Sequence, residues 1–296
     1  MKTAKALTLT YLTPVSFASL NGSDKEADNI SNIKKISVGV EQFPYVSSQA
    51  VRRALRNQLE VILGKEKLSE GVAASISKGA ATTKQEPENY IDDDLFGYMG
   101  TESAEGKNKG KATKRTSVVR VSPLLALTPY QADLDFGTNY MSVKAGGDPN
   151  IFETEIHSGL YRGSILIELD RVGCGDGFDK PIENKEKAAR VKALLSAVKN
   201  LWASGRQTRF LADISPKFIA AAMLKTKNPI FLESVQVEGK KLNVDMIKET
   251  LKDYKSETIS SVIGLRKGVF IGDIENSKSI GEAFDEMGTW VDQHYA

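Results

Sequence analysis

The sequence predicts an α+β fold, in which one β-sheet carries helices mainly on one of its faces. Strand-like and helix-like segments alternate over the first two thirds of the chain, and the last third is rich in further strand-like segments. The chain of 296 residues is 41% hydrophobic and 26% charged, which is typical of a globular protein long enough to bury a large core.

The first forty residues contain two extended segments. Residues 5–20 alternate apolar and polar side chains, which predicts a long strand. Because threonines interrupt the apolar residues, we expect neither a membrane span nor a signal peptide here. A polar loop rich in turn formers follows at 21–32, and a second extended segment is expected at 36–41.

The clearest helix begins after Ser47 and Ser48. Apolar residues recur at helical spacing from Val51 to Ile62. A serine in front of such a run is a common N-cap, because its hydroxyl accepts a hydrogen bond from a free backbone N–H of the first turn. We therefore predict a helix whose N-cap is Ser47 or Ser48.

The remaining elements follow from the same two periodicities. Their order is strand, helix, strand, helix, strand with a strand-rich tail, which is typical of ferredoxin-like or RRM-like domains. We expect strands at 116–121, 163–169, 206–214, 230–237 and 259–271, helices at 184–202, 244–255 and 279–293, and either element at 216–224.

A charged stretch interrupts this order. Residues 85–106 carry seven acidic and no basic side chains, and residues 107–120 carry six basic and no acidic ones. Such blocks repel themselves and resist packing, so we expect a mobile surface insertion at about 79–115. Within it, the consecutive Asp92, Asp93 and Asp94 are most simply a solvated charge run, although carboxylates can also gather a divalent ion.

A second interruption lies at 128–160. Its side chains alternate in places, and Gly146, Gly147, Asp148 and Pro149 stand near its middle. Glycine, aspartate and proline favour turns, so this stretch is expected to form a hairpin-like excursion from the sheet.

The sequence contains few residues in the patterns that catalytic sites use. The two histidines, His157 and His294, show no metal-ligand spacing, and no nucleophile elbow or phosphate-binding loop occurs. We therefore expect no enzyme activity, no metal and no cofactor. The single cysteine, Cys174, excludes an internal disulfide and fits a reducing cytoplasm.

One constellation suggests anion binding. Arg52, Arg53 and Arg56 lie in the first turns of the helix that begins after Ser47, and helix N-termini attract phosphate. A second basic cluster surrounds Arg206 and Arg209. The formal charge of +2 carries no global signal for nucleic acid, and both clusters are also compatible with ordinary solvated surface.

Four motifs in this order resemble one protein family over about residues 6–225. They are FPYVSSQAVRRALR at 43–56, preceded by LNGSD at 20–24, then DLFGYM at 94–99, RTSVVRV at 115–121 and SGRQTRFLA at 204–212. The sequence is similar to the repeated backbone subunit (Cas-seven or DevR-type) of type I CRISPR Cascade complexes, with subtype I-B as the nearest variety.

The resemblance implies a hand-like architecture. It has an RRM-like (ferredoxin-like) palm, assigned to 1–63, 116–127 and 161–296, with a finger insertion at 64–115 and a thumb hairpin at 128–160. The resemblance also implies that the subunit polymerises along a CRISPR guide RNA, holds its phosphates and kinks it at regular intervals with the thumb. The implied RNA-binding residues are Asn21, Ser47, Ser48, Gln49, Arg52, Arg53, Arg56, Arg206, Gln207 and Arg209, and the candidate wedge residues of the thumb are Tyr140, Met141 and Phe152.

The implied partners are the guide RNA, the target DNA strand and further copies of the chain. Other Cascade subunits are also expected: a guide-processing endonuclease, a subunit that caps the 5′ end of the guide, and a large target-recognition subunit. A cytoplasmic location and no membrane partner complete this expectation. For the acidic block at 86–105, repulsion of stray nucleic acid, contact with an inner subunit, and no role at all stay open.

Two other functions stay open at this point. Related type III subunits cleave target RNA with an acidic residue after the first strand, and Asp24 or Asp28 could provide one with a metal ion. The label attached to DevR-type proteins also suggests a DNA-binding autoregulator, although no helix-turn-helix is evident.

Overall fold

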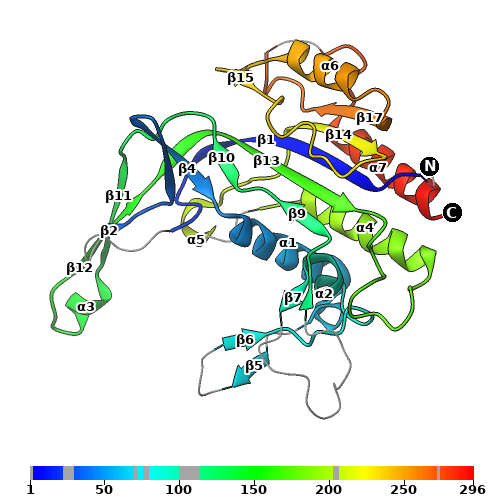
Figure 1. The fold of residues 1–296 in the computed structure, drawn as a ribbon. Coiled ribbons are helices and arrows are strands. Elements are labelled where there is room, and N and C mark those ends of the chain that lie inside the picture. Colours follow the sequence, from blue (N-terminus) through cyan, green and yellow to red (C-terminus); the bar gives the residue numbers. More distant parts are fainter. Residues whose placement is uncertain are drawn as a thin grey trace.

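The computed structural model describes residues 3–22, 30–69, 72–75, 80–99, 114–202, 207–271 and 274–296. Its centre is an eight-stranded sheet in which all strand pairs are antiparallel (Figure 1). The order across the sheet is β17-β14-β1-β13-β10-β4-β3, and β9 pairs with β13 beside β10. The strands are β1 (Ala6–Ala18), β3 (Lys35–Val38), β4 (Glu41–Val46), β9 (Val119–Val121), β10 (Leu124–Ala126), β13 (His157–Glu168), β14 (Phe218–Leu224) and β17 (Thr258–Leu265).

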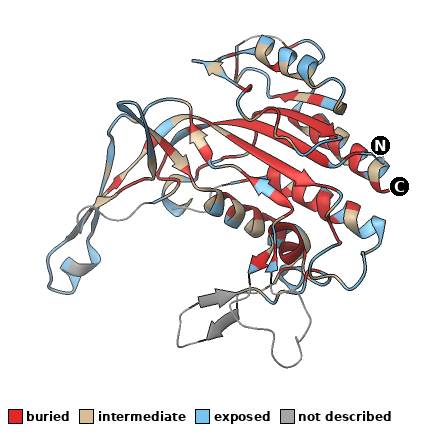
Figure 2. Cartoon of the chain, viewed as in Figure 1, coloured by how far each residue is buried: buried red, intermediate tan, exposed pale blue. Residues whose placement is uncertain are grey.

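Three long helices cover one face of this sheet. Helices α1 (Ser48–Leu63), α4 (Asn184–Lys199) and α7 (Ile280–Tyr295) pack their buried sides on alternate residues of the central strands. Figure 2 shows the central strands as largely buried. Each large apolar side chain buried there contributes about 1.5–3 kcal/mol, so this layer is the main source of stability.

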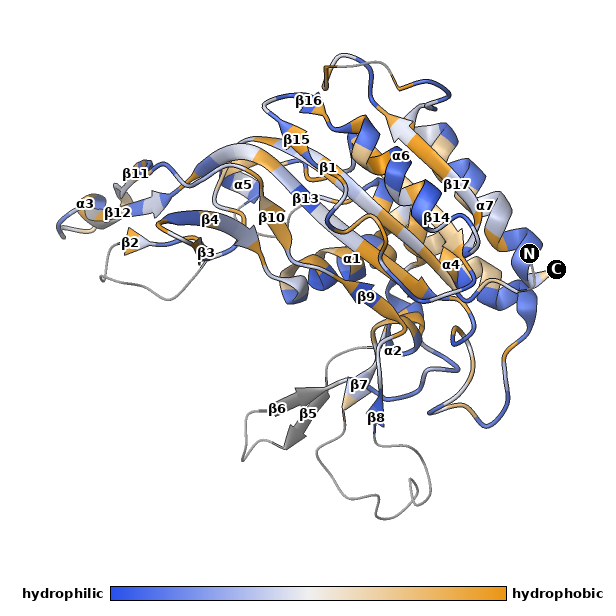
Figure 3. Cartoon of the chain, turned by 45° about the horizontal axis from the view of Figure 1, so that its top comes forward, coloured by the Kyte–Doolittle hydropathy of each residue, from blue (hydrophilic) through white to orange (hydrophobic). Residues whose placement is uncertain are grey.

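The other face of the sheet is covered only in part. Helix α6 (Val244–Asp253) and the small hairpin of β15 (Val237–Glu238) and β16 (Lys241–Leu242) lie over β14 and β17, where Ile247 and Phe218 belong to a second, smaller core. Hydrophobic residues concentrate in the central strands, whereas the connecting loops are largely hydrophilic (Figure 3). In the part of the chain that the structure describes, no helix is long and apolar enough to cross a membrane.

Two projections leave the sheet (Figure 1). The hairpin projection consists of β11 (Leu134–Asn139), α3 (Met141–Lys144) and β12 (Asn150–Glu155), and β2 (Ile30–Ser31) pairs parallel with β12. The second projection follows α1. It contains η1 (Lys65–Lys67), β5 (Val72–Ser75), β6 (Ala80–Thr82), α2 (Ile91–Phe96), β7 (Tyr98–Met99) and β8 (Lys114–Arg115).

Most of the predicted elements are present. The long first strand, the helix that begins after the Ser47 cap, the helices near 184, 244 and 279, and the hairpin at 128–160 are confirmed. The segment 216–224, compatible with either element, forms the fully buried strand β14. Of the apolar positions predicted for α1, Ile62 is exposed because it lies on the outer side of the last turn.

Three predicted strands are wrong. Residues 36–41 do not form one extended segment, because Gly39 adopts a positive φ of 62° and reverses the chain between β3 and β4. In place of a strand at 206–214, a short helix α5 (Gln207–Phe210) is followed by irregular chain. The apolar run within 230–237 forms turns that bury Ile230 and Phe231 in the second core.

The acidic run of α2 is buried, and the prediction of a solvated charge run is therefore wrong. The Asp94 carboxylate accepts hydrogen bonds from Arg115 at 2.5 Å, from Arg190 at 2.8 Å and from the Gly173 N–H. Asp92 accepts from the backbone N–H of Ser69, and Asp93 from that of Glu86. Buried carboxylates persist only when such donors replace water.

The prediction of a mobile insertion at about 79–115 is therefore also wrong for α2 and Arg115, which pack against the rest of the protein. Arg115 is fully buried and also donates to the carbonyl oxygens of Asp94, Arg171, Cys174 and Asp176. These contacts fix the second projection to the sheet. Residues 100–113 lie outside the described residues.

Candidate nucleic-acid interface

The start of α1 is held in place by two polar side chains. The Oδ1 of Asn21 accepts a hydrogen bond from the Ser47 N–H at 2.8 Å, and the Ser47 Oγ accepts one from the Ala50 N–H at 3.3 Å. Asn21 and Ser47 therefore orient the helix start. The remaining N–H groups of the first turn have no acceptor within the helix, and this turn contains no acidic residue, so its positive end attracts anions.

Arg52 and Arg53 lie in the first turns of this helix. Arg53 is exposed, whereas Arg52 is half-buried, and its buried Nε has no hydrogen-bond partner among the described residues. Burial and the positive charge of Arg120 both lower the pKa of Arg52. An anion bound beside Arg52 would offset the repulsion between Arg52 and Arg120.

Arg120 was not among the predicted site residues. It lies on β9 between the buried Val119 and Val121, so the alternation of the strand places its side chain on the opposite face from theirs. It donates two hydrogen bonds to Glu168, of 2.9 and 2.7 Å. The alternation in the sequence could have indicated its orientation, but only the fold brings it near Arg52.

Arg56 is attached to the second projection. Its guanidinium group lies over the ring of Phe96 at 4.6 Å, and its Nε is 3.7 Å from the Asp92 carboxylate. Burial lowers the pKa of Arg56, and the charge of Asp92 opposes this shift. Burial also raises the pKa of Asp92. Arg56 thus links α1 to α2, in addition to any contact with a ligand.

Ser48 and Gln49 complete the helix start. The Ser48 hydroxyl donates a hydrogen bond to the Gln49 side-chain oxygen at 3.3 Å, and this contact is solvent-exposed. The structure therefore brings six of the predicted residues together at one helix end, where they present hydroxyl, amide and guanidinium groups. They are Asn21, Ser47, Ser48, Gln49, Arg52 and Arg53.

The second basic cluster has a different environment. Arg206 lies outside the described residues. Arg209 pairs with Asp135 at 2.5 Å, donates to Thr154 at 3.0 Å, and stacks over the Phe152 ring at 4.7 Å. It therefore attaches α5 to the hairpin projection. Both polar atoms of the Gln207 amide are buried without a hydrogen-bond partner among the described residues.

The three predicted wedge residues lie at two places on the hairpin projection. Tyr140 and Met141, at its tip, are 69% and 67% exposed. Phe152 is half-buried beneath Arg209. Sequence reasoning missed an exposed apolar face formed by Leu134, Phe136 and Ile151, although the alternation of the segment LDFGTN could have indicated it.

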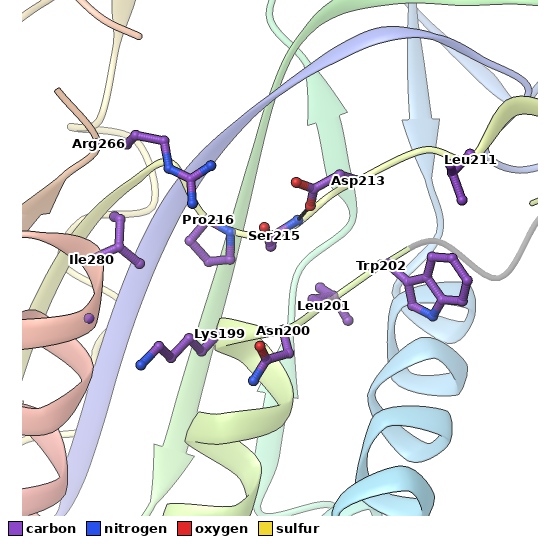
Figure 4. Close-up of a pocket in the computed structure, with 11 residues that line it drawn as sticks. Lys199, Asn200, Leu201, Trp202, Leu211, Asp213, Ser215, Pro216, Arg266 and Ile280 are labelled. Carbon is purple, nitrogen blue, oxygen red and sulfur yellow. Dashed lines mark hydrogen bonds between the residues drawn. The ribbon is translucent and has the colours of Figure 1, made fainter. Parts of the chain in front are cut away.

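A cavity of about 440 Å³ lies away from these residues, between the end of α4 and the start of α7 (Figure 4). Lys199, Arg266 and Asp213 line it together with the apolar Trp202 and Leu211. None of the predicted site residues lines this cavity. Within the described ranges, no group of three or more His, Cys, Asp or Glu side chains could hold a metal ion, and Asp24 and Asp28 lie outside those ranges.

The chain is thus an α+β protein in which a basic helix start lies beside an antiparallel sheet. A family model described as "CRISPR-associated negative auto-regulator DevR/Csa2" matches residues 13–245, and the chain belongs to this family. The chain is 27% identical to the CRISPR-associated protein Cas7/Cst2/DevR of Myxococcus xanthus, over 80% of this chain and 78% of that protein.

Other similarities extend over nearly the whole chain. It is 24% identical to the CRISPR-associated aCascade subunit Cas7/Csa2 2 of Saccharolobus solfataricus, over 94% of this chain and 92% of that protein. Its fold is similar to a chain of a CRISPR RNA-guided surveillance complex, with a TM-score of 0.60, 16% identity and coverage of 96% of this chain and 99% of that one. A second such complex, described as pre-nicking, gives a TM-score of 0.63 at 13% identity, over 97% and 99% of the two chains.

Proposed function

We propose that this protein is a non-catalytic backbone subunit of a CRISPR surveillance complex and binds the guide RNA. The observation that carries the proposal is the start of α1, where an acid-free first turn, two partly exposed serines, the half-buried Arg52 and the exposed Arg53 form a surface suited to phosphate. Membership of the DevR/Csa2 family and the fold similarity to surveillance-complex subunits support the same role.

Such a subunit accepts every guide sequence, so its contacts go to sugar and phosphate and not to base edges. The groups at the start of α1 suit this task because hydroxyl, backbone N–H and guanidinium groups all donate to phosphate oxygens. Few phosphates need to be neutralised per copy, because affinity accumulates along a chain of linked copies. The near-neutral charge of +2 is compatible with this arrangement.

The proposal also assigns the sheet, the second projection and the hairpin projection to the palm, fingers and thumb of such a subunit. The strand order β14-β1-β13-β10, with α1 and α4 on one face, supports an RRM-like palm. The second projection corresponds to the fingers and the hairpin projection to the thumb, whose exposed Tyr140 and Met141 kink the guide. The copies polymerise along the guide in the cytoplasm and display its bases to a target DNA strand, beside the other Cascade subunits of a subtype I-B complex.

The proposal is tested by purifying the chain from cells that express its neighbouring genes and a CRISPR array. We expect a particle with several copies of the chain and a ribonuclease-sensitive RNA of uniform length. Double replacement of Arg52 and Arg53 by alanine should deplete the RNA. Arg266→Ala, which removes an exposed arginine at the cavity of Figure 4, should not. A nucleic-acid-free monomer would contradict the proposal.

A second candidate is the autoregulator named in the family description. Binding of the purified chain to one DNA duplex and not to others would favour it. The nuclease alternative predicts magnesium-dependent cleavage of a complementary RNA, lost on Asp24→Ala. Either result would replace the non-catalytic role proposed above.

A further inference from the structure

A second cavity, of about 340 Å³, lies at the base of the hairpin projection. It is formed where the end of β1 approaches the junction of β12 and β13, and its size is at the lower end of small-molecule sites. The lining side chains used below are Phe17, Thr128, Gln131, Asp133, His157 and Ser158.

Phe17 provides an aromatic surface at this cavity. It is 49% exposed, and Phe210 supports it in an edge-on contact with ring centroids 5.9 Å apart. Phe210 lies in turn near the Arg209 guanidinium group, which stacks on Phe152. Phe17 is thus the exposed end of a packed row of rings and a guanidinium group. An aromatic ring held in this way is a stacking surface for a planar ligand.

His157 provides a buried polar group at the same cavity. It is 5% exposed, and its Nδ1 is 2.8 Å from the Tyr161 hydroxyl. Its Nε2 has no hydrogen-bond partner among the described residues. At Gly159, a Cβ atom would lie 2.5 Å from the Cε1 of His157 and 2.9 Å from the Oγ1 of Thr128. The absence of a side chain at Gly159 therefore makes room for both groups.

Apart from the Asp133 carboxylate, which only accepts, the polar groups of the lining can either donate or accept hydrogen bonds. This holds for the hydroxyls of Thr128 and Ser158, for the Gln131 amide and for a neutral imidazole. Burial lowers the pKa of His157, which keeps its ring neutral at physiological pH. Among the described residues, no Lys or Arg lines the cavity. It therefore suits a neutral planar ligand with mixed donors and acceptors, and it does not suit a phosphate.

The cavity lies close to the phosphate-binding helix start. Phe17 precedes Asn21 by four residues, which span at most about 14 Å, and Asn21 holds the Ser47 N–H at the start of α1. We propose that this cavity takes one nucleobase of a bound single-stranded RNA, stacked on Phe17, while the neighbouring phosphates contact α1. This inference rests on the proposed RNA-binding function and adds a base site to it.

The test compares two ligands of equal length, a single-stranded oligouridylate and an abasic ribose-phosphate oligomer, on the full chain. Phe17→Leu keeps an apolar contact with Phe210 but removes the stacking surface, and Phe17→Tyr keeps both. We expect Phe17→Leu to weaken binding of the oligouridylate about tenfold and to leave binding of the abasic oligomer unchanged. Phe17→Tyr and the matched control Trp202→Leu, at a 45% exposed aromatic residue in the other cavity, should bind both ligands like the wild type.

Each other outcome overturns a defined part of this inference. If Phe17→Leu weakens both ligands equally, or neither, the base site is wrong while RNA binding by α1 stands. If the wild type binds neither ligand, the proposed function fails and the base site fails with it. Circular dichroism of Phe17→Leu confirms that a loss of binding is not a loss of fold.

Discussion

Helices α1 and α2 each begin with a cluster of like charges, and the fold treats the two clusters in opposite ways. The arginines of α1 lie at a solvent-accessible helix end, where Arg53 is exposed and the Nε of Arg52 is unpaired. The aspartates of α2 are buried, and Asp94 is held by Arg115 and Arg190. Like charges that are buried with partners are bound to the fold, because the loss of one partner leaves an uncompensated charge, whereas like charges without partners at the surface are available to a ligand.

The largest effect is expected at Asp94. Asp94→Ala leaves the buried guanidinium groups of Arg115 and Arg190 without their carboxylate, which should lower the free energy of unfolding by about 3–5 kcal/mol. Urea unfolding followed by circular dichroism measures this change. Asp148→Ala, at an exposed aspartate of the hairpin projection, is the control and should be neutral. A neutral Asp94→Ala would mean that the α2 cluster is not structural.

Glu168, a paired acid on the sheet, should make the stability of the protein depend on pH. Hydrogen bonds from Lys227, Arg120 and Arg171 outweigh burial and lower the pKa of Glu168 from 4.5 to about 2. The stabilisation is therefore complete above pH 4.5 and is lost as the pH falls toward 2. At neutral pH, Glu168→Gln should cost about 2 kcal/mol of unfolding free energy. Urea titrations over this range should show wild type and variant converging in acid, and a constant difference would contradict the assignment.

Arg52 tests whether the arginines of α1 bind RNA. Arg52→Ala should weaken binding of single-stranded RNA about tenfold and leave the unfolding free energy almost unchanged, because its Nε has no partner to lose. The dependence of log K on log salt should also become shallower by about 0.7. Fluorescence anisotropy at several salt concentrations measures both quantities. Loss of stability with unchanged binding would place Arg52 with the structural arginines.

The smallest effect is expected at Arg56, which belongs to both helices. Arg56→Gln removes the contact with Phe96 and the long ion pair with Asp92, and should cost about 1 kcal/mol of unfolding free energy. Thermal unfolding and RNA binding of the same variant separate its two roles. If binding falls as much as in Arg52→Ala, Arg56 also contacts phosphate; if only stability falls, it is a link between α1 and α2.

Local signals in the sequence predicted much of the fold and which residues gather at the start of α1. The start of α1 was predictable because its N-cap, its apolar spacing and its arginines lie within a few residues of one another. The hairpin at 128–160 was predictable from its turn residues. The failures involve distant partners: the donors to Asp94 lie 21, 79 and 96 residues away along the chain, so the sequence pattern shows an acidic run but not its neutralisation.

Partners that are distant in sequence also explain why the surroundings of Arg209 and the turns within 230–237 were not predicted. Arg209 resembles a phosphate ligand in sequence, but Asp135 and Thr154 of the hairpin projection occupy its guanidinium group. The apolar residues Ile230 and Phe231 resemble a strand in sequence. They form turns instead, because the second core around β14 buries them without hydrogen bonds to a neighbouring strand. No local pattern marked Phe17, since the role proposed for it depends on a neighbour at position 210.

Arg209 also bears on the geometry of an assembly. Its contacts with Asp135, Thr154 and Phe152 tie the hairpin projection to α5. If identical copies follow one another along the guide as proposed, each contact between neighbours repeats the same rotation, so the geometry of one contact sets the pitch of the resulting helix. If the hairpin projection takes part in that contact, a change of a few degrees in its orientation would be multiplied by the number of copies and would displace one end of the particle relative to the other.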